Sequence, residues 1–310
     1  MSRGEQLMVP EPEFESYYGR PILKKPTWKT PDVPLYLFLG GMAGSSALLA
    51  EGAALRDLPA LERVARFAAA GGAAAGTVAL VHDLGRPERF LNMLRVLKVT
   101  SPLSVGSFIL APFSALSTAA AGSMVTGWFP RLGRLAGVGA AAFGPPLATY
   151  TAALVADTAV PAWHEAHREL PFVFAGSGAT AAGGLAMIFT PLDQAAPARR
   201  MAVAGAALEI AAAESIITRR GLAAEPYTIG RPGRLMKTAR TMTAVAAGAT
   251  LLVGRRSRLV SAAAGAACVA ASVLTRFGVF EAGIASSQDP KYVVVPQRER
   301  LQQREAARAH

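Results

Sequence analysis

Long uncharged runs alternate with short clusters of charge along most of the chain. A helix that crosses a bilayer needs about 20 apolar residues, with roughly 17–25 tolerated. Eight runs meet this need and predict membrane spans, at residues 34–55, 63–82, 103–127, 135–159, 171–191, 200–217, 238–254 and 258–281. The seventh has the shortest uncharged part, so Lys237 and Arg240 must extend toward the interface to complete it.

The two ends of the chain differ from these runs. Residues 1–33 are polar, charged and rich in proline, which favours an extended arm over a helix. A cleavable signal peptide is not expected from this composition. Residues 285–310 form a second polar tail, in which 297–309 favours a short helix.

Two short stretches recur in the same order. Pro34–Gly41 resembles Pro171–Gly176, and Gly85–Phe90 resembles Gly230–Leu235. Four predicted spans separate the copies, so both copies have the same orientation, as in parallel membrane repeats. Residues 34–160 and 161–284 therefore predict two parallel four-helix bundles, and the expected fold is an all-α polytopic membrane protein.

Composition supports this fold class. Hydrophobic residues make up 52% of the chain and charged residues 17%, whereas soluble domains carry about a quarter charged residues. A soluble enzyme, a disordered chain and a disulfide scaffold are thereby excluded. With Cys268 as the single cysteine and four histidines in all, we expect no disulfide, metal site, iron–sulfur centre or haem.

The formal charge of +11 is distributed unevenly between the two sides of the membrane. The side that holds both tails carries about twice as many Lys and Arg residues as the other. This excess predicts cytoplasmic N- and C-termini in the inner (cytoplasmic) membrane of the cell. The charge is therefore a topology signal, and no nucleic-acid partner is expected.

Ionisable groups within a membrane are costly, so each is a candidate for function. His82 and Asp83 end the second span, where an imidazole can exchange a proton with a bound quinone. The alternative is a solvated ion-pair loop formed with Arg86, Glu88 and Arg89.

Other candidates lie deeper. Tyr150 follows Pro145 and Pro146, and its hydroxyl is suited to a quinone carbonyl, although packed aromatics are common at such sites. Asp157, Glu209 and Glu214 are either steps of a proton relay or members of local pairs. Glu209 and Glu214 are five residues apart, about 500° around a helix, so they do not share a face.

Two further patterns have structural interpretations. Arg276 and Glu281 are expected to form an ion pair near the end of the eighth span. Trp28, Trp128 and Trp163 fall near predicted span ends and are expected to be interfacial anchors.

Several of these residues belong to motifs that resemble a known family. The motifs are Phe38–Gly44, His82–Phe90, Ser101–Ser104, Tyr150–Ala152 and Arg276–Pro290. They resemble the NrfD/PsrC-type membrane subunit of polysulfide-reductase-like respiratory complexes. The run Asp-Leu-Gly-Arg-Pro-x-Arg-Phe, which begins at Asp83, is the specific part, and the resemblance extends from Tyr36 to Pro290.

The resemblance implies eight helices in two bundles, with a quinone site in the first bundle. It implies menaquinone as the substrate, a four-cluster ferredoxin-like iron–sulfur subunit and a molybdopterin catalytic subunit as partners, and no metal in this chain. Tyr150, His82 and Asp83 match the family's quinone-site residues. At the start of the first span the polar residues are Asp32 and Tyr36, so Tyr36 joins these candidates, as does Asp157.

The expected function is that of a membrane anchor and quinone-reactive subunit, which passes electrons between an iron–sulfur partner and the quinone pool. The chain would then act within an oxidoreductase complex, without a complete active site or catalytic residues of its own. Cytoplasmic termini favour a formate-dehydrogenase-like complex. Arg86, Arg89, Lys24 and Lys25 are the expected docking residues. The alternatives are a secondary transporter built on a four-helix repeat and a passive anchor without a quinone site.

Overall fold

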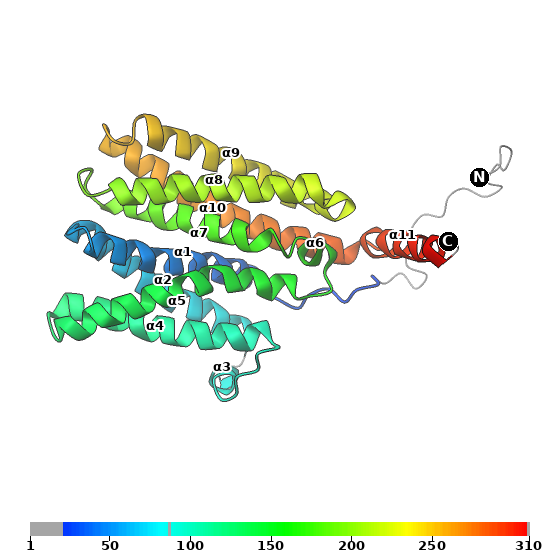
Figure 1. The fold of residues 1–310 in the computed structure, drawn as a ribbon, viewed down its shortest axis with the longest axis horizontal. Coiled ribbons are helices and arrows are strands. Elements are labelled where there is room, and N and C mark those ends of the chain that lie inside the picture. The colour runs from blue at the N-terminus through cyan, green and yellow to red at the C-terminus, as the bar shows by residue number, and fades with distance from the viewer. Residues whose placement is uncertain (1–20, 86–87, 309–310) are drawn as a thin grey trace.

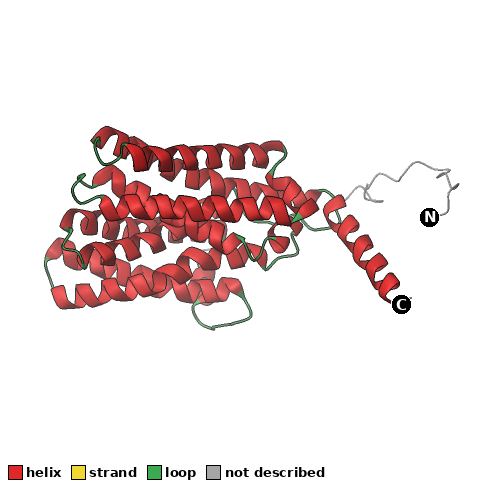
Figure 2. Cartoon of the chain, turned by 45° about the horizontal axis from the view of Figure 1, so that its top comes forward, coloured by secondary structure: helices red, strands yellow, loops and turns green. Residues whose placement is uncertain are grey.

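The computed structural model describes residues 21–85 and 88–308, apart from the side chains of residues 89, 91 and 308. All regular structure in this part of the chain is helical (Figure 2). The long helices of the bundle are α1 (Asp32–Ala54), α2 (Pro59–Asp83), α4 (Pro102–Thr126), α5 (Pro130–Ala156), α7 (Leu170–Phe189), α8 (Ala196–Arg219), α9 (Gly230–Leu252) and α10 (Arg258–Gln288). The peripheral helices are α3 (Glu88–Met93), α6 (Pro161–Glu165), the 3-10 helix η1 (Gly221–Tyr227) and α11 (Lys291–Arg308).

Within the described residues, seven helices are long and apolar enough to cross a membrane: α1, α2, α4, α5, α7, α8 and α10. The chain is therefore a multi-pass membrane protein. The expected seventh span, 238–254, lies mostly within α9, which does not reach the same hydropathy. The first half of α9 carries Arg231, Arg234, Lys237 and Arg240, which lower its mean hydropathy.

Local chemistry sets several helix boundaries. Pro59, Pro102 and Pro130 stand at the first position of their helices, where proline costs no backbone hydrogen bond. Gly127 ends α4 with φ 70°, in the left-handed conformation that glycine adopts freely. Pro130 starts α5 five residues before the expected span, and α10 continues to Gln288, beyond the expected end.

The helices lie side by side, with those of the first half below those of the second in Figure 1. In the first half α1 packs against α2 and α5, and α4 packs against α5. In the second half α7 packs against α8 and α10, and α9 packs against α10. The two halves meet mainly where α7 contacts α1 and α5.

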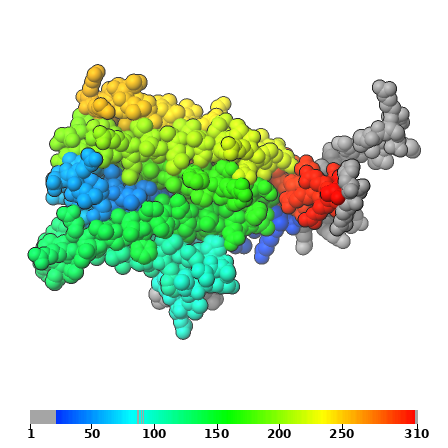
Figure 3. Space-filling model, viewed as in Figure 1, coloured from blue at the N-terminus to red at the C-terminus, as the bar shows by residue number. Residues whose placement is uncertain are grey.

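The described chain begins and ends at the same end of the bundle (Figure 1). We call this end, which holds residues 21–31, α6, η1 and α11, the arm end. The opposite end, with the short connections 55–58, 127–129, 190–195 and 253–257, is the loop end. Figure 3 shows the stretch around α3 as a cyan lobe beside the bundle.

Trp163 holds the arm end together. Its side chain is fully buried, and its Nε1 donates a hydrogen bond of 2.7 Å to the Val279 carbonyl. Trp28 of the arm stacks on it, with ring centroids 5.5 Å apart. The sequence interpretation of Trp163 as an interfacial anchor is wrong, because its ring packs inside the protein. Trp128, by contrast, is exposed at the loop end.

The tail helix is longer than expected. α11 begins at Lys291, six residues before the expected start at 297, and projects from the arm end (Figure 2). Lys291 Nζ contacts Glu225 Oε1 of η1 at 3.0 Å, and this hydrogen bond raises the pKa of Lys291. A tertiary contact that sequence periodicity does not report therefore stabilises the first turn of α11.

Candidate functional site

The arm is hydrogen-bonded to the end of α2, where the candidate residues His82 and Asp83 lie. The Lys29 backbone N–H donates to Asp83 Oδ1 at 2.9 Å, and Lys29 Nζ donates to the His82 carbonyl at 3.3 Å. These contacts fix the start of α1 beside the last turn of α2. Asp83 is therefore engaged by the arm.

His82 has an acidic partner, Asp32, which was not among the site residues expected from the sequence. Its Nδ1 lies 2.8 Å from Asp32 Oδ2 in the first turn of α1. The Asp32 side chain is 15% exposed and the His82 side chain 73% exposed, so the carboxylate holds an imidazole that stays accessible. Such a pair fixes the orientation of the imidazole ring. The signal in the sequence was Asp32 itself, an acid four residues before Tyr36.

Tyr36 lies one helical turn after Asp32, so the two residues share a face of α1. Its side chain is buried, and its hydroxyl has no hydrogen-bond partner among the described residues. A buried hydroxyl without a partner is costly, so the site is suited to a ligand that accepts or donates a hydrogen bond.

Tyr150 of α5 packs against α4. A Cβ added to Gly106 would lie 2.0 Å from Tyr150 Cε2, so the ring lies directly on the glycine backbone. Tyr150 is therefore tightly placed in the first half, as is the neighbouring Thr151, whose buried hydroxyl also lacks a described partner. Asp157 lies apart, exposed at the C-terminal end of α5.

The expected docking residues are only partly described. Lys24 and Lys25 are exposed on the arm. Arg89 lies on α3, but its side chain is outside the described part of the structure, and Arg86 is outside the described residues altogether.

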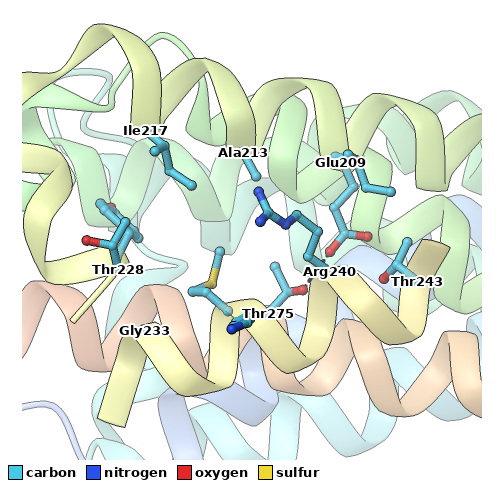
Figure 4. A pocket seen from close by; sticks show the side chains of 12 residues that line it. Glu209, Ala213, Ile217, Thr228, Gly233, Arg240, Thr243 and Thr275 are labelled. Atoms are coloured by element: carbon cyan, nitrogen blue, oxygen red, sulfur yellow. Dashed lines mark hydrogen bonds between the residues drawn. The ribbon is translucent and has the colours of Figure 1, made fainter. Parts of the chain in front are cut away.

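A cavity of about 170 Å³ lies in the second half, between α8, α9, α10 and η1 (Figure 4). Glu209, which is 4% exposed, lines the cavity from α8. Thr275 Oγ1 donates a 2.5 Å hydrogen bond to Glu209 Oε1, while Glu209 Oε2 has no partner among the described residues. The walls are mostly apolar, from Ile210, Ile217 and Met236 among others. The carboxylate of Glu209, with one oxygen unpaired among the described residues, therefore borders a space with room for water.

The second acid of α8 has a different environment. Glu214 is exposed and forms an ion pair of 2.6 Å with Arg240, which lines the cavity from α9. The structure thus places Glu209 inside the cavity and Glu214 in a pair that joins α8 to α9. Of the two roles expected from the sequence, a proton relay or a local ion pair, Glu214 has the second.

Tyr227 closes the cavity at the arm end. Burial and the negative charge of Glu169 raise the pKa of its hydroxyl above the ordinary value. The phenol therefore stays protonated and donates a 3.0 Å hydrogen bond to the Ala162 carbonyl. This bond ties η1 to α6.

Arg276 is fully buried beside this cavity, and the expected Arg276–Glu281 pair is not formed. Arg276 Nη2 donates to the Phe174 carbonyl at 2.7 Å, and the guanidinium lies 3.8 Å from the Phe174 ring centre. Its Nε and Nη1 have no described partner, and the opposite charge of Glu209 acts on it. Glu281 pairs instead with Arg231, at 3.3 Å. Arg276 and Glu281 are five residues apart, about 500° around the helix, so their side chains lie on different faces of α10.

The described residues contain no group of three or more His, Cys, Asp or Glu side chains that could hold a metal ion. Cys268 is buried as a free thiol.

Comparison with known proteins identifies one family. A model of the family described as polysulphide reductase, NrfD, matches residues 24–195. The matched segment includes the arm contacts, His82, Tyr36 and Tyr150, whereas the Glu209 cavity lies beyond it. No curated protein matches the chain.

Proposed function

Because the chain belongs to the NrfD family of polysulphide reductase membrane proteins, we propose that it exchanges electrons between a respiratory complex and membrane quinone. The family supplies membrane subunits of oxidoreductase complexes. The observation that carries the quinone proposal is the accessible His82–Asp32 pair, which lies within the matched segment. Asp32 is one helical turn before Tyr36, whose buried hydroxyl has no hydrogen-bond partner among the described residues.

A quinone takes up two protons when it accepts two electrons, so its site needs groups that bind its oxygens and move protons. His82 is suited to exchange a proton, with Asp32 orienting its imidazole. Tyr36 and Tyr150 are the phenols available to hold the quinone oxygens, and the tight packing of Tyr150 on Gly106 supports a fixed position. We propose menaquinone as the quinone.

We propose that α9 is an eighth span and that the two halves are parallel repeats. The proposal is supported by helix packing, because the pairs α1 with α2, α1 with α5 and α4 with α5 correspond to α7 with α8, α7 with α10 and α9 with α10. The basic residues of α9 lie toward its arm end, where long side chains can reach the interface. The N-terminal arm and the C-terminal tail then lie on one side of the membrane.

The arm end is the proposed docking face for an iron–sulfur subunit and, through it, a molybdopterin subunit. It carries exposed Lys24 and Lys25, and charged contacts favour docking. The excess of Lys and Arg on this side supports a cytoplasmic face, and hence a complex that oxidises a cytoplasmic donor such as formate. A C-terminal reporter that is active only outside the cytoplasm would contradict this orientation.

We propose a second role in proton movement for Glu209. The supporting observation is its buried carboxylate at the floor of the cavity, with Oε2 unpaired and Thr275 on the other oxygen. A cavity with polar groups can hold water, which carries protons to such a group. Proton uptake by a Glu209→Gln variant tests this role.

The quinone proposal is tested on the complex purified from membranes with its own partners. We expect His82→Asn to lower quinone-linked turnover about 100-fold, the lower range for loss of a proton-transfer group. Turnover with a soluble dye that takes electrons from the partner subunits should be unchanged, and so should co-purification of those subunits.

The matched control is His167→Asn. His167 is also an exposed histidine at the arm end, but its Nδ1 hydrogen-bonds to the His164 carbonyl, at 2.9 Å, and pairs with no described carboxylate. Quinone-linked turnover that survives in the His82 variant, with the complex intact, would favour a passive anchor. Equal losses in both variants would show a general effect of the arm-end surface.

A further inference from the structure

A groove of about 560 Å³ lies at the loop end, between the start of α8 and the end of α9. Three arginines line it: Arg199 and Arg200 from the first turn of α8, and Arg255 from the connection after α9. It lies at the opposite end of α8 from η1, and outside the segment that matches the family model.

The three guanidinium groups form no ion pair with a described carboxylate. Arg199 Nη1 donates to the Leu192 carbonyl at 3.2 Å, and the charges of Arg200 and Arg255 both act on the Arg199 guanidinium. Like charges held around one space repel one another, so an anion between them would be stabilised.

Two other arginines near the loop end have partners inside the protein. Arg66 pairs with Glu51 and Glu62, each at 2.8 Å. Arg258 donates to the carbonyls of Met187 and Ile188 at the end of α7. The groove arginines differ from Arg66 in having no ion pair with a described carboxylate, and all three line one common space.

Apart from Thr250, the other side chains that line the groove are apolar. Val203 and Ala207 follow the arginines along α8, and Leu251 faces them from α9, where it is 62% exposed. Cations at the level of the membrane surface, followed by apolar side chains at bilayer depth, match the order of a phospholipid's phosphate and acyl chains. A soluble anionic protein would match only the arginines.

We propose that this groove binds one anionic glycerophospholipid, with its phosphate between Arg199, Arg200 and Arg255 and its acyl chains along Val203 and Leu251. The inference requires α9 to lie in the bilayer beside α8, but it does not depend on quinone exchange. Arginine suits this role because its planar guanidinium donates two parallel hydrogen bonds to phosphate oxygens.

The test uses the full-length chain, purified in detergent and depleted of lipid. Native mass spectrometry measures the binding of phosphatidylglycerol and of phosphatidylcholine with the same acyl chains. We expect phosphatidylglycerol to bind more tightly, and the variant R199Q/R200Q/R255Q to lose about fivefold in phosphatidylglycerol affinity for each arginine replaced. Arg255→Gln alone, in a connection, gives the single-site effect in case the triple variant folds poorly.

The matched control is R56Q/R131Q/R134Q, which removes three exposed arginines from the same end of the molecule but outside the groove. We expect this control to bind phosphatidylglycerol as the wild type does. The proposal is overturned if the two lipids bind equally, if the groove variant binds normally, or if the control loses as much. Displacement of the lipid by millimolar inorganic phosphate would also overturn it, because the groove would then be a site for free anions.

Discussion

Two carboxylates of α8, five positions apart, have different surroundings. Glu209 is buried against α10 and bonded to Thr275, whereas Glu214 is half exposed and paired with Arg240. The difference follows from helical geometry, since five residues turn the second side chain about 140° away from the first. Only Glu209 is thus in a position to bind a proton away from bulk solvent.

We predict that Glu209→Gln retains the fold and lowers proton uptake during quinone-linked turnover. The amide has nearly the same shape and still accepts from Thr275, but it cannot take a proton at ordinary pH. The measurement is proton uptake per electron in vesicles that contain the complex, together with thermal unfolding of each variant.

Glu214→Gln is the control, because its ion pair is exposed and contributes at most about 1 kcal/mol. It should leave proton uptake unchanged. Normal uptake in Glu209→Gln would remove the second role that we propose for the cavity, without bearing on the His82 site.

At the scale of elements, glycines decide how closely the helices approach. A Cβ on Gly44 of α1 would lie 2.4 Å from the Gly144 carbonyl oxygen of α5. A Cβ on Gly178 of α7 would lie 2.7 Å from the Gly41 carbonyl oxygen of α1. These are backbone atoms, so a larger side chain must separate the helices. In lipid, dispersion between such closely packed backbones is a main source of helix association.

We predict that Gly44→Ala destabilises the chain by about 1–3 kcal/mol, the range for overpacking a tight contact. The control is Gly71→Ala on α2, where an added Cβ has no atom within 4 Å. That substitution should be neutral or stabilise by about 0.5–1 kcal/mol, because alanine loses less conformational entropy in a helix. Unfolding of the purified variants in denaturing detergent measures both, and equal effects would mean that the Gly44 approach is not a stabilising contact.

At the scale of the molecule, the arm, α6, η1 and α11 gather at one end, while the other end has short connections. The described termini therefore lie together. Contacts such as Trp28 on Trp163 and Lys291 on Glu225 join segments that are far apart in the chain.

We predict that Ile229→Cys and Gln302→Cys react with a membrane-impermeant maleimide from the cytoplasmic side, and Arg256→Cys from the opposite side. The three positions are exposed, and they test whether α9 crosses the membrane. The background is low, because the native thiol of Cys268 is fully buried. Labelling in sealed vesicles of each orientation makes the measurement, and labelling of Ile229→Cys and Arg256→Cys from the same side would exclude α9 as a span.

The helices were predictable because a bilayer requires long apolar runs, and each expected run lies largely within an observed helix. The family was predictable from a contiguous motif, the run from His82 to Phe90. The hydropathy of α9 does not identify it as a span, because its four basic residues keep its mean hydropathy below that of the seven apolar helices.

Contacts between distant residues were decided only by the tertiary structure. Asp32 meets His82 across 50 positions, Thr275 meets Glu209 across 66, and Trp163 is buried at a predicted interface. The long helices, seven of them apolar enough to cross a membrane, could be predicted from the sequence because backbone hydrogen bonding and hydropathy act locally. The sequence did not determine which polar side chains pair, because that depends on the rotation and spacing of helices, which are set by packing across the whole bundle.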